Sequence, residues 1–492
     1  MKRHSLKVNA IFNALYQVLI LIVPLITTPY ISRVLGPDAN GIYANFYSFV
    51  QYFVLVASFG FVDFGTKKIA ESRDNPSELT KNFLLVSINK GIFGLSCLII
   101  YIGTVFILFP NNSLFALIFS FYIISVILDP VFYFNGQERF ITICIRNIIL
   151  KTVSTVLIFL LVKGPEDLSL YTLILALSQL FSILIMIPSI EFKKFVKVKI
   201  TFKDLADNFK KSFSYFVPAL AVSLFTFLNQ SILGFFGKDD AESGYYAQTV
   251  KIIQVLTSLS ASIGIIMLSR MSYLNSANNE EEAERKIKQS FQAFWVLSLP
   301  LTFGICAINS KFIPVFLGEG YERCILLTYV LSPTIIIGPL NGLYGSIYFR
   351  PKDKIRIHTL ITLCAALINV VLSIVMVPFY GALGTTIGRL FAELLQLPFL
   401  VFFARKYIDI KIPFKTIIKP LISSSLMFIA VYLYNCYGFQ LIDDVYINLF
   451  IMILMGVLIY GALEIALKDE IVYSNVKIIF SKIFRRKNKQ EI

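Results

Sequence analysis

Apolar stretches long enough to cross a lipid bilayer fill most of the chain. About 20 apolar residues cross the hydrocarbon core as a helix, and a soluble domain has no interior large enough to bury many such stretches. The composition agrees, because 57% of the 492 residues are hydrophobic and only 15% are charged. The sequence therefore predicts an all-α polytopic membrane protein with about fourteen spans, near residues 9–31, 41–61, 83–109, 113–134, 141–162, 168–190, 209–235, 244–268, 287–308, 322–348, 357–377, 381–404, 417–438 and 445–467.

The connections between these spans alternate in charge. Those after the second, sixth, eighth, tenth and twelfth spans are rich in Lys and Arg, as are both termini, whereas the others are poor in basic residues or acidic. Lys and Arg accumulate in loops that face the cytoplasm, so both termini are predicted to be cytoplasmic. The same bias accounts for the net charge of +15 without nucleic-acid binding.

The short connections leave no room for a catalytic or nucleotide-binding domain outside the bilayer. No Gly-rich loop ends in Lys-Ser or Lys-Thr, as ATP binding of that kind would require, and the six cysteines lack metal-ligand spacing. No Ser/His/Asp or Cys/His arrangement is recognisable. We therefore expect a secondary transporter without cofactor, metal or catalytic residues.

Two halves of the chain share a sequence pattern. Leu35-Gly36 followed by Gly41-Ile-Tyr43 recurs as Leu233-Gly234 followed by Gly244-Tyr-Tyr246, and 134–140 resembles 349–355. Six spans separate the copies, so the repeats have the same orientation. This predicts two parallel six-helix lobes around a central cavity, with boundaries at residues 1–190 for the first lobe, 191–208 for a cytoplasmic linker, 209–410 for the second lobe, and 411–492 for two extra helices and a basic tail.

The outer end of the first span carries Pro24, Pro29 and a Thr pair at 27–28, followed by a predicted turn over residues 37–41. A proline in a membrane helix frees a carbonyl that another helix, a hydroxyl group or water must satisfy. Such helix ends usually line a cavity, which again favours a transporter.

Basic side chains inside the spans are functional candidates, because a charge in the bilayer is costly. Lys90 and Arg146 lie within two turns of the cytoplasmic end, where they can also snorkel to the interface. Lys151 and Lys251 lie deeper. Arg389 precedes Glu393 by one helical turn, so this pair either neutralises itself or is functional.

Acidic residues are fewer within the spans. Asp129 and Glu393 are the candidates for coupling to H⁺ or Na⁺, although Asp129 also fits a carboxylate at a helix end. The remaining acids in or beside the spans are Asp63 and Glu464.

Amide side chains form polar stripes that can face a lumen. Asn9, Asn13 and Gln17 recur every four residues, and the amides offer the donors and acceptors that sugar hydroxyls need. The alternative is a hydrogen-bonded seam between helices. When the two halves are aligned by their repeated glycines, a second polar stripe, Asn45, Ser48 and Gln51, is matched with Gln248, Lys251 and Gln254.

Together these features resemble the polysaccharide transporter branch of the multidrug/oligosaccharidyl-lipid/polysaccharide exporter superfamily. The resemblance covers the first twelve spans and is most specific in three places, Pro29-Tyr30-Ile-Ser-Arg33-Val-Leu-Gly36, Gly41-Ile-Tyr43 with Phe59-Gly60 to Gly65, and Phe134-Asn-Gly-Gln-Glu-Arg-Phe140.

The resemblance implies a flippase for undecaprenyl-diphosphate-linked oligosaccharide in the bacterial cytoplasmic membrane. It implies alternating access around a cationic cavity, and delivery of units for capsule, exopolysaccharide or O-antigen assembly, with a polymerase and chain-length proteins as possible partners. Arg33 matches the family's arginine at the outer end of the first span. No family motif fixes the basic residues inside the spans, so on the charge argument alone the expected diphosphate ligands are Lys90, Arg146, Lys151, Lys251 and Arg389, and the amides line the sugar path. A lipid II flippase, a drug/cation antiporter and a membrane polysaccharide polymerase remain alternatives.

Overall fold

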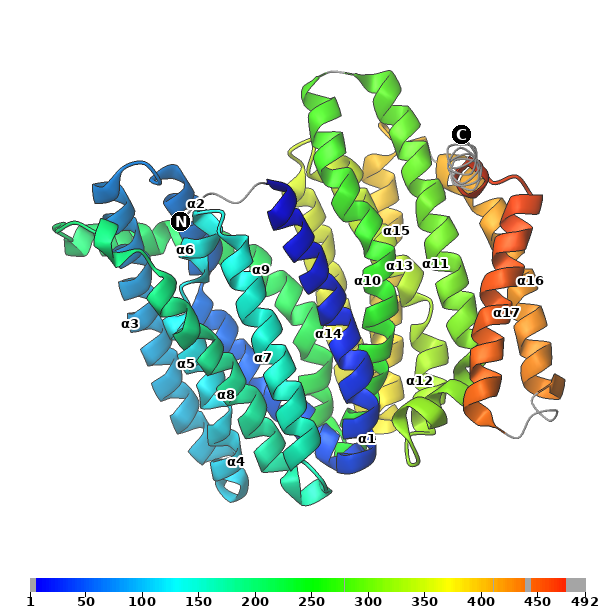
Figure 1. Cartoon of the computed structure of the whole chain (residues 1–492), viewed down its shortest axis with the longest axis horizontal. Helices are drawn as coiled ribbons and strands as arrows, with labels where there is room; N and C mark the ends of the chain where they lie inside the picture. The colour runs from blue at the N-terminus through cyan, green and yellow to red at the C-terminus, as the bar shows by residue number, and fades with distance from the viewer. Residues whose placement is uncertain (1–5, 278, 410, 439–443, 475–492) are drawn as a thin grey trace, which may run out of the picture. The chain divides into compact units, whose positions relative to one another are not determined.

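The structure is a computed structural model that describes residues 6–277, 279–409, 411–438 and 444–474, with the side chains of 6–21, 217–219, 221–222 and 224–226 excluded. The described residues form helices and no strands, as expected (Figure 1). The α-helices are α1 (Leu6–Ser58), α2 (Phe61–Glu71), α3 (Pro76–Leu108), α4 (Ser113–Ile118), α5 (Ser120–Leu128), α6 (Val131–Gly136), α7 (Phe140–Leu161), α8 (Leu168–Met186), α9 (Phe202–Phe236), α10 (Asp240–Ser276), α11 (Glu280–Leu317), α12 (Arg323–Leu331), α13 (Thr334–Tyr344), α14 (Ile355–Tyr380), α15 (Ala382–Ala404), α16 (Lys411–Tyr437) and α17 (Val445–Ala466).

Helix α1 contains the first two predicted spans, which meet at Gly36. Gly36 has φ 72° and ψ 175°, a conformation that glycine adopts without strain, and the chain turns there (Figure 1). The predicted turn over 37–41 is wrong, because the second arm is helical from Pro37 onward. Pro37 suits the first position of a helix, where its missing N–H has no intrahelical partner to lose.

Twelve described segments are long and apolar enough to cross a membrane. The first, Ile22–Glu71, contains both arms of α1, and α9 contributes only the shorter apolar stretch Phe227–Phe236. Dividing the first segment at Gly36 and adding α9 accounts for the fourteen predicted spans.

Two predicted spans are broken. Residues 113–134 form α4, α5 and α6, and residues 322–348 form α12 and α13 followed by a π-helical turn, Gly345–Phe349. Pro130 and Pro333 lie at two of these breaks, where proline removes a helical hydrogen bond.

The chain divides into two compact units, Met1–Ala247 and Gln248–Ile492. In the first unit, α9 packs against α1, α2 and α3. In the second unit, α11, α16 and α17 pack against one another, and α14 packs against α15. The lobe and linker boundaries derived from the repeat remain a prediction.

The backbone supports the internal repeat at its second motif. Glu138 and Asp353, which are equivalent in the repeat, are both left-handed, with φ 57° and 56°. The next residue closes the same hydrogen bond in both copies, from Arg139 N to Phe134 O at 2.9 Å and from Lys354 N to Phe349 O at 2.7 Å. Left-handed non-glycine residues are uncommon, so their recurrence at matched positions points to a shared local fold.

The repeated glycines at the first motif pack against each other. A Cβ on Gly41 would lie 1.8 Å from the carbonyl oxygen of Asp240, and a Cβ on Gly244 would lie 2.1 Å from that of Pro37. The second arm of α1 and the first turns of α10 therefore cross at backbone contact, as helices in membranes do through small residues.

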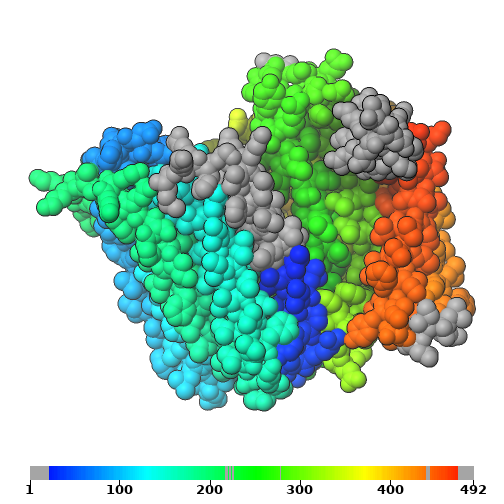
Figure 2. Space-filling model, in the orientation of Figure 1, coloured from blue at the N-terminus to red at the C-terminus, as the bar shows by residue number. Residues whose placement is uncertain are grey.

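Many outward-facing side chains are large and apolar. Helix α17 lies at the surface in Figure 2, and its Phe450, Val457 and Leu458 are more than 60% exposed. Helix α3 exposes Ile99 and Ile107 similarly. Apolar surface on this scale is typical of contact with lipid, so the protein is a multi-pass integral membrane protein.

Ion pairs hold the segment after α8 against the rest of the first unit. Glu191 bonds Arg139 and Lys194, and the bonds from Lys194 and Arg139 lower the pKa of Glu191. Asp204 accepts a 2.8 Å hydrogen bond from Lys81 and caps α9 with Thr201. The Lys81 bond, followed by those from Thr201, lowers the pKa of Asp204 to about 2.

We expect Asp204→Asn to lower thermal stability at neutral pH and to lose this effect in acid. A carboxylate with a depressed pKa stabilises the fold above its unfolded pKa of 3.8, and that contribution disappears as the pH falls through the folded value of about 2. Thermal unfolding of both proteins between pH 7 and 2 measures the difference. A difference that persists unchanged at pH 2 would contradict this assignment.

Candidate functional site

Lys90, Asp129 and Arg146 form one buried cluster in the first unit. Lys90 Nζ donates to the backbone carbonyl of Asp129 and lies 5.3 Å from the centre of the Phe132 ring. Arg146 Nη1 lies 3.9 Å from Asp129 Oδ1, which also accepts from the Val131 N–H at 2.9 Å. The turn between α5 and α6 thus presents the oxygens of Asp129 to α3 and α7.

Burial rules out the snorkelling interpretation of the two cations. Lys90 is 2% exposed and Arg146 is 8% exposed. Asp129 is half-buried at the end of α5, which confirms the expected carboxylate at a helix end. The cluster thus contains two buried cations beside one carboxylate, which pairs with Arg146 while Lys90 bonds the backbone carbonyl. A desolvated positive charge attracts an anionic group far more strongly than an exposed one.

Lys151 lies on α7, five residues after Arg146. Its side chain is half-buried and makes no hydrogen bond or ion pair with the side chains that the structure describes. Helix α7 packs against α1, whose Asn13 and Gln17 have side chains outside the described set. Their predicted role in sugar binding therefore stays a prediction.

In the second unit, Lys251 and Gln248 lie together on α10. Lys251 Nζ donates to Gln248 Oε1 at 3.3 Å, so the structure joins two predicted site residues from the same polar stripe. Lys251 is half-buried, Gln248 is fully buried, and Gln254 is exposed.

The amide of Asn45 lies in a hydrogen-bonded seam. Its Nδ2 donates to Asp240 Oδ1 at 3.1 Å, and its Oδ1 accepts from Gln230 Nε2 at 3.0 Å. One turn further along α1, the Ser48 and Ser231 hydroxyls are 3.0 Å apart. In this conformation Asn45 thus belongs to a hydrogen-bonded seam between α1, α9 and α10.

The seam borders a small cavity of about 200 Å³ lined by Asn45, Phe46, Phe235 and Asp240. Gln51 is half-buried two turns further along α1, and Arg33 is exposed in the first arm, close to Gly36. The structure does not join these two residues to the cluster around Lys90.

Arg389 and Glu393 form the predicted intrahelical pair on α15. Arg389 Nε donates to Glu393 Oε1 at 3.1 Å, and Glu393 is 6% exposed. Asn341 on α13 donates to the Glu393 carbonyl at 3.2 Å, and Gln396 donates to Thr362 on α14 at 2.9 Å. The pair therefore belongs to a polar network inside the second unit.

We expect Arg389→Met to destabilise the protein by about 3–5 kcal/mol, because Glu393 would remain buried without its cation. The double variant Arg389→Met/Glu393→Gln should recover much of this loss. Thermal unfolding of wild type, both single variants and the double variant in detergent gives the coupling. Additive losses would show that the two side chains do not depend on each other.

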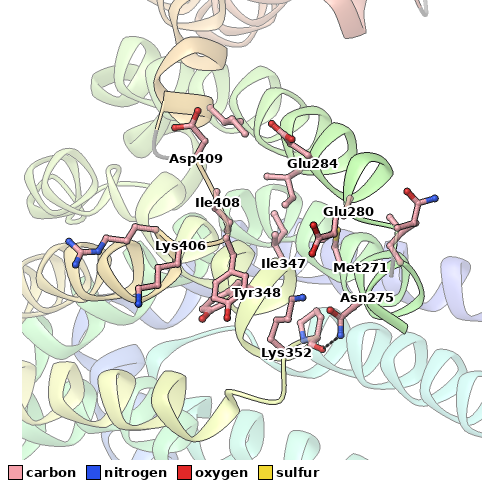
Figure 3. Close-up of a pocket in the computed structure, with 18 residues that line it drawn as sticks. Met271, Asn275, Glu280, Glu284, Ile347, Tyr348, Lys352, Lys406, Ile408 and Asp409 are labelled. Carbon is pink, nitrogen blue, oxygen red and sulfur yellow. Dashed lines mark hydrogen bonds between the residues drawn. The ribbon is translucent and has the colours of Figure 1, made fainter. Parts of the chain in front are cut away.

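A cavity of about 560 Å³ lies in the second unit and contains none of the predicted site residues (Figure 3). Its lining combines apolar side chains such as Met271 and Ile347 with the charged side chains of Glu280, Glu284 and Lys352. Among the described residues, no group of three His, Cys, Asp or Glu side chains is placed to hold a metal.

Several residues of these networks were not predicted from the sequence. Asp240 and Gln230 complete the Asn45 seam, and Phe132 covers Lys90. Asp239 and Asp240 lie in one of the acidic connections, and their position just before Gly244 in the repeat marks them as neighbours of the first motif.

Comparison with known proteins places this architecture in a family. Residues 6–269, just over half of the chain, match the family described as "Polysaccharide biosynthesis protein". Proteins of Escherichia coli K12 and Shigella dysenteriae, both named as proposed O-antigen transporters, are 22% and 24% identical over 405 and 411 residues. Each alignment covers 82% of this chain and at least 97% of the relative.

Solved structures share the fold. A lipid II flippase MurJ in an inward closed conformation superimposes with a TM-score of 0.74 at 16% identity, covering 94% of this chain and all of that one. An inward-facing multidrug resistance MATE transporter of the MOP superfamily gives 0.61 at 12% identity, covering 78% and 94%. These relatives and structural neighbours are named as transporters and flippases, in agreement with the prediction of a transporter rather than an enzyme.

Proposed function

Because the chain belongs to the polysaccharide biosynthesis protein family, we propose that it flips undecaprenyl-diphosphate-linked oligosaccharide units across the bacterial cytoplasmic membrane. The observation that carries the proposal is the family match over residues 6–269, which includes both arms of α1 and every helix from α2 to α9. The names of the two enterobacterial relatives point to the same substrate class.

The charge of the helices supports this substrate. A diphosphate cannot enter hydrocarbon unaided, and buried Lys and Arg side chains offset part of its desolvation. Arg146 pairs with the Asp129 carboxylate and Lys90 bonds the backbone carbonyl of the same residue, while Lys151 and Lys251 have no acidic partner among the described residues. Under this proposal these four cations bind the diphosphate at successive stages of transport, and Arg389 contributes less because Glu393 neutralises it.

The amides contribute the sugar contacts in the same proposal. Gln51, Gln248 and Gln254 remain candidates, with Asn13, Gln17 and Arg33 from the first arm of α1. Asn45 would become available to sugars only when its bonds to Asp240 and Gln230 open.

Membrane potential favours the export direction. Moving a negative charge out of a negative cytoplasm releases about 2.3 kcal/mol per charge per 100 mV. Alternating access with both termini in the cytoplasm then needs no ATP. Counter-transport of H⁺ or Na⁺, with Asp129 or Glu393 as the carrier, remains part of the proposal, as do membrane lipid, a polymerase and chain-length proteins as partners.

Depletion of the protein in its host tests the proposal. We expect lipid-linked oligosaccharide to accumulate in the inner leaflet while surface polysaccharide disappears, with the glycosyltransferases still active. Normal export in depleted cells would refute it.

A lipid II flippase carries the same diphosphate lipid and is the second candidate. Rescue of a strain depleted of its own lipid II flippase would favour that function, whereas rescue of a strain lacking its O-antigen transporter favours the first. A drug/cation antiporter should confer drug resistance, and a polymerase should extend the polymer without moving it.

A further inference from the structure

Glu464 is a fully buried carboxylate that none of the preceding sites uses. It lies near the C-terminal end of α17, and its side chain has no exposed surface. Neither of its carboxylate oxygens has a hydrogen-bond partner among the described residues. Helix α17 packs against α11 and α16, so Glu464 belongs to a three-helix junction within the second unit (Figure 1).

Each of the other two helices contributes unpartnered oxygen atoms to this junction. On α16, the Ser423 hydroxyl is close enough to interact with Glu464, yet its Oγ makes no bond of normal geometry. On α11, Gln292 donates from Nε2 to Asp469 Oδ2 at 2.8 Å, which leaves its Oε1 buried and unpartnered. Tyr460, one turn before Glu464, donates to the Val296 carbonyl at 2.8 Å, so α11 contacts the C-terminal end of α17 through Val296 and the residues just after it through Gln292.

The charged and titratable groups around the junction do not pair with Glu464. Lys419 on α16 donates to the Lys468 carbonyl at 3.0 Å. Asp469 accepts from Gln292 and from the N–H groups of Ile471 and Val472. The Tyr460 hydroxyl donates to the backbone carbonyl of Val296. Lys419 acts on Glu464 only through its longer-range charge and forms no ion pair with it among the described residues, unlike Arg389 with Glu393.

A buried carboxylate must be neutralised, because an isolated charge in the interior is very costly. The unpartnered atoms here are all oxygens, which are the ligands that hard cations such as Na⁺ prefer over nitrogen and sulfur. A proton neutralises the same carboxylate by converting it into a hydroxyl donor for Ser423 or Gln292.

We propose that Glu464, Ser423 and Gln292 form a monovalent-cation site between α11, α16 and α17. The cation is Na⁺ or H⁺, and its charge compensates Glu464 in the absence of a basic partner. Because α16 and α17 follow the two predicted six-helix lobes, this site is separate from both earlier candidates for ion coupling, Asp129 and Glu393.

Thermal stability of the purified protein in detergent tests the site. In the sodium arm, NaCl replaces choline chloride at constant ionic strength and neutral pH. In the proton arm, the pH is lowered from 8 to 5 without Na⁺. We expect the Tm of the wild-type protein to rise in at least one arm, and the arm that responds identifies the cation.

Glu464→Gln should be stable without the cation and should not respond in the arm to which wild type responds, because its side chain is neutral. Glu470→Gln is the matched control, since Glu470 is exposed and pairs with Lys288 nearby. It should respond like wild type. If Na⁺ is the cation, Ser423→Ala removes one ligand and weakens Na⁺ binding. The Na⁺ concentration that gives half of the maximal rise in Tm should then increase about tenfold or more.

The proposal is overturned if wild type responds in neither arm, or if Glu464→Gln responds as wild type does. If Glu464→Gln does not fold, Ser423→Ala decides the sodium case, and Glu464→Ala, which removes the carboxyl group, decides the proton case by losing the response. If the variant that folds does not show the effect named for it, the proposal is also overturned.

Discussion

Gly41→Ala is expected to abolish polysaccharide export and to lower the Tm by about 1–3 °C. The added Cβ would lie 1.8 Å from the Asp240 carbonyl oxygen, so no side-chain rotation relieves the clash and the helices must separate. Overpacking of this kind costs about 1–3 kcal/mol or more. Surface polysaccharide and thermal unfolding in detergent are the measurements.

Gly103→Ala is the matched control for this prediction. Gly103 also lies within a long helix, but a Cβ there would meet nothing within 4 Å. Alanine favours a helix over glycine by about 1 kcal/mol, so this variant should be as stable as wild type or more stable. If both variants behaved alike, the close crossing of α1 and α10 would be wrong.

Lys251→Met is expected to reduce export at least tenfold while leaving protein abundance unchanged. Methionine keeps the length of the side chain but removes its charge and its hydrogen bond to the substrate. A hydrogen bond to a charged group contributes about 1.5–3 kcal/mol. Lys151→Met should behave in the same way. Export is measured as surface polysaccharide per unit of membrane-inserted protein.

Lys251→Arg should retain most of the export, because the positive charge remains. Lys203→Met is the control for loss of a basic residue outside the spans, since Lys203 is exposed at the start of α9. Wild-type export by both Lys251→Met and Lys151→Met, at normal abundance, would remove the deep lysines from the substrate path.

Features governed by local sequence could be predicted well. Span length and hydropathy indicated the polytopic helical fold, and four-residue spacing indicated the Arg389 and Glu393 pair. The repeat also matched Glu138 with Asp353, which share a left-handed backbone. These predictions succeed because helix periodicity and backbone conformation are properties of neighbouring residues.

Features governed by tertiary packing could not be predicted in the same way. Lys90 was expected to be able to snorkel, but the turn after α5 brings Asp129 and Phe132 over it from 39 and 42 residues away. The partners of Asn45 come from α9 and α10, almost 200 residues later. Glu464 was recognised as an acid in the last span, yet only packing shows that it has no partner. Hydropathy contains none of this information.

Flipping by the purified protein in liposomes tests the central claim most directly. Vesicles containing a fluorescent undecaprenyl-diphosphate oligosaccharide would be probed with an impermeant glycosidase or reductant that reaches only the outer leaflet. We predict that the protected inner pool becomes accessible in vesicles with wild-type protein, and more slowly with Lys251→Met. Equal protection in protein-containing and empty vesicles, with correctly folded protein, would contradict the account.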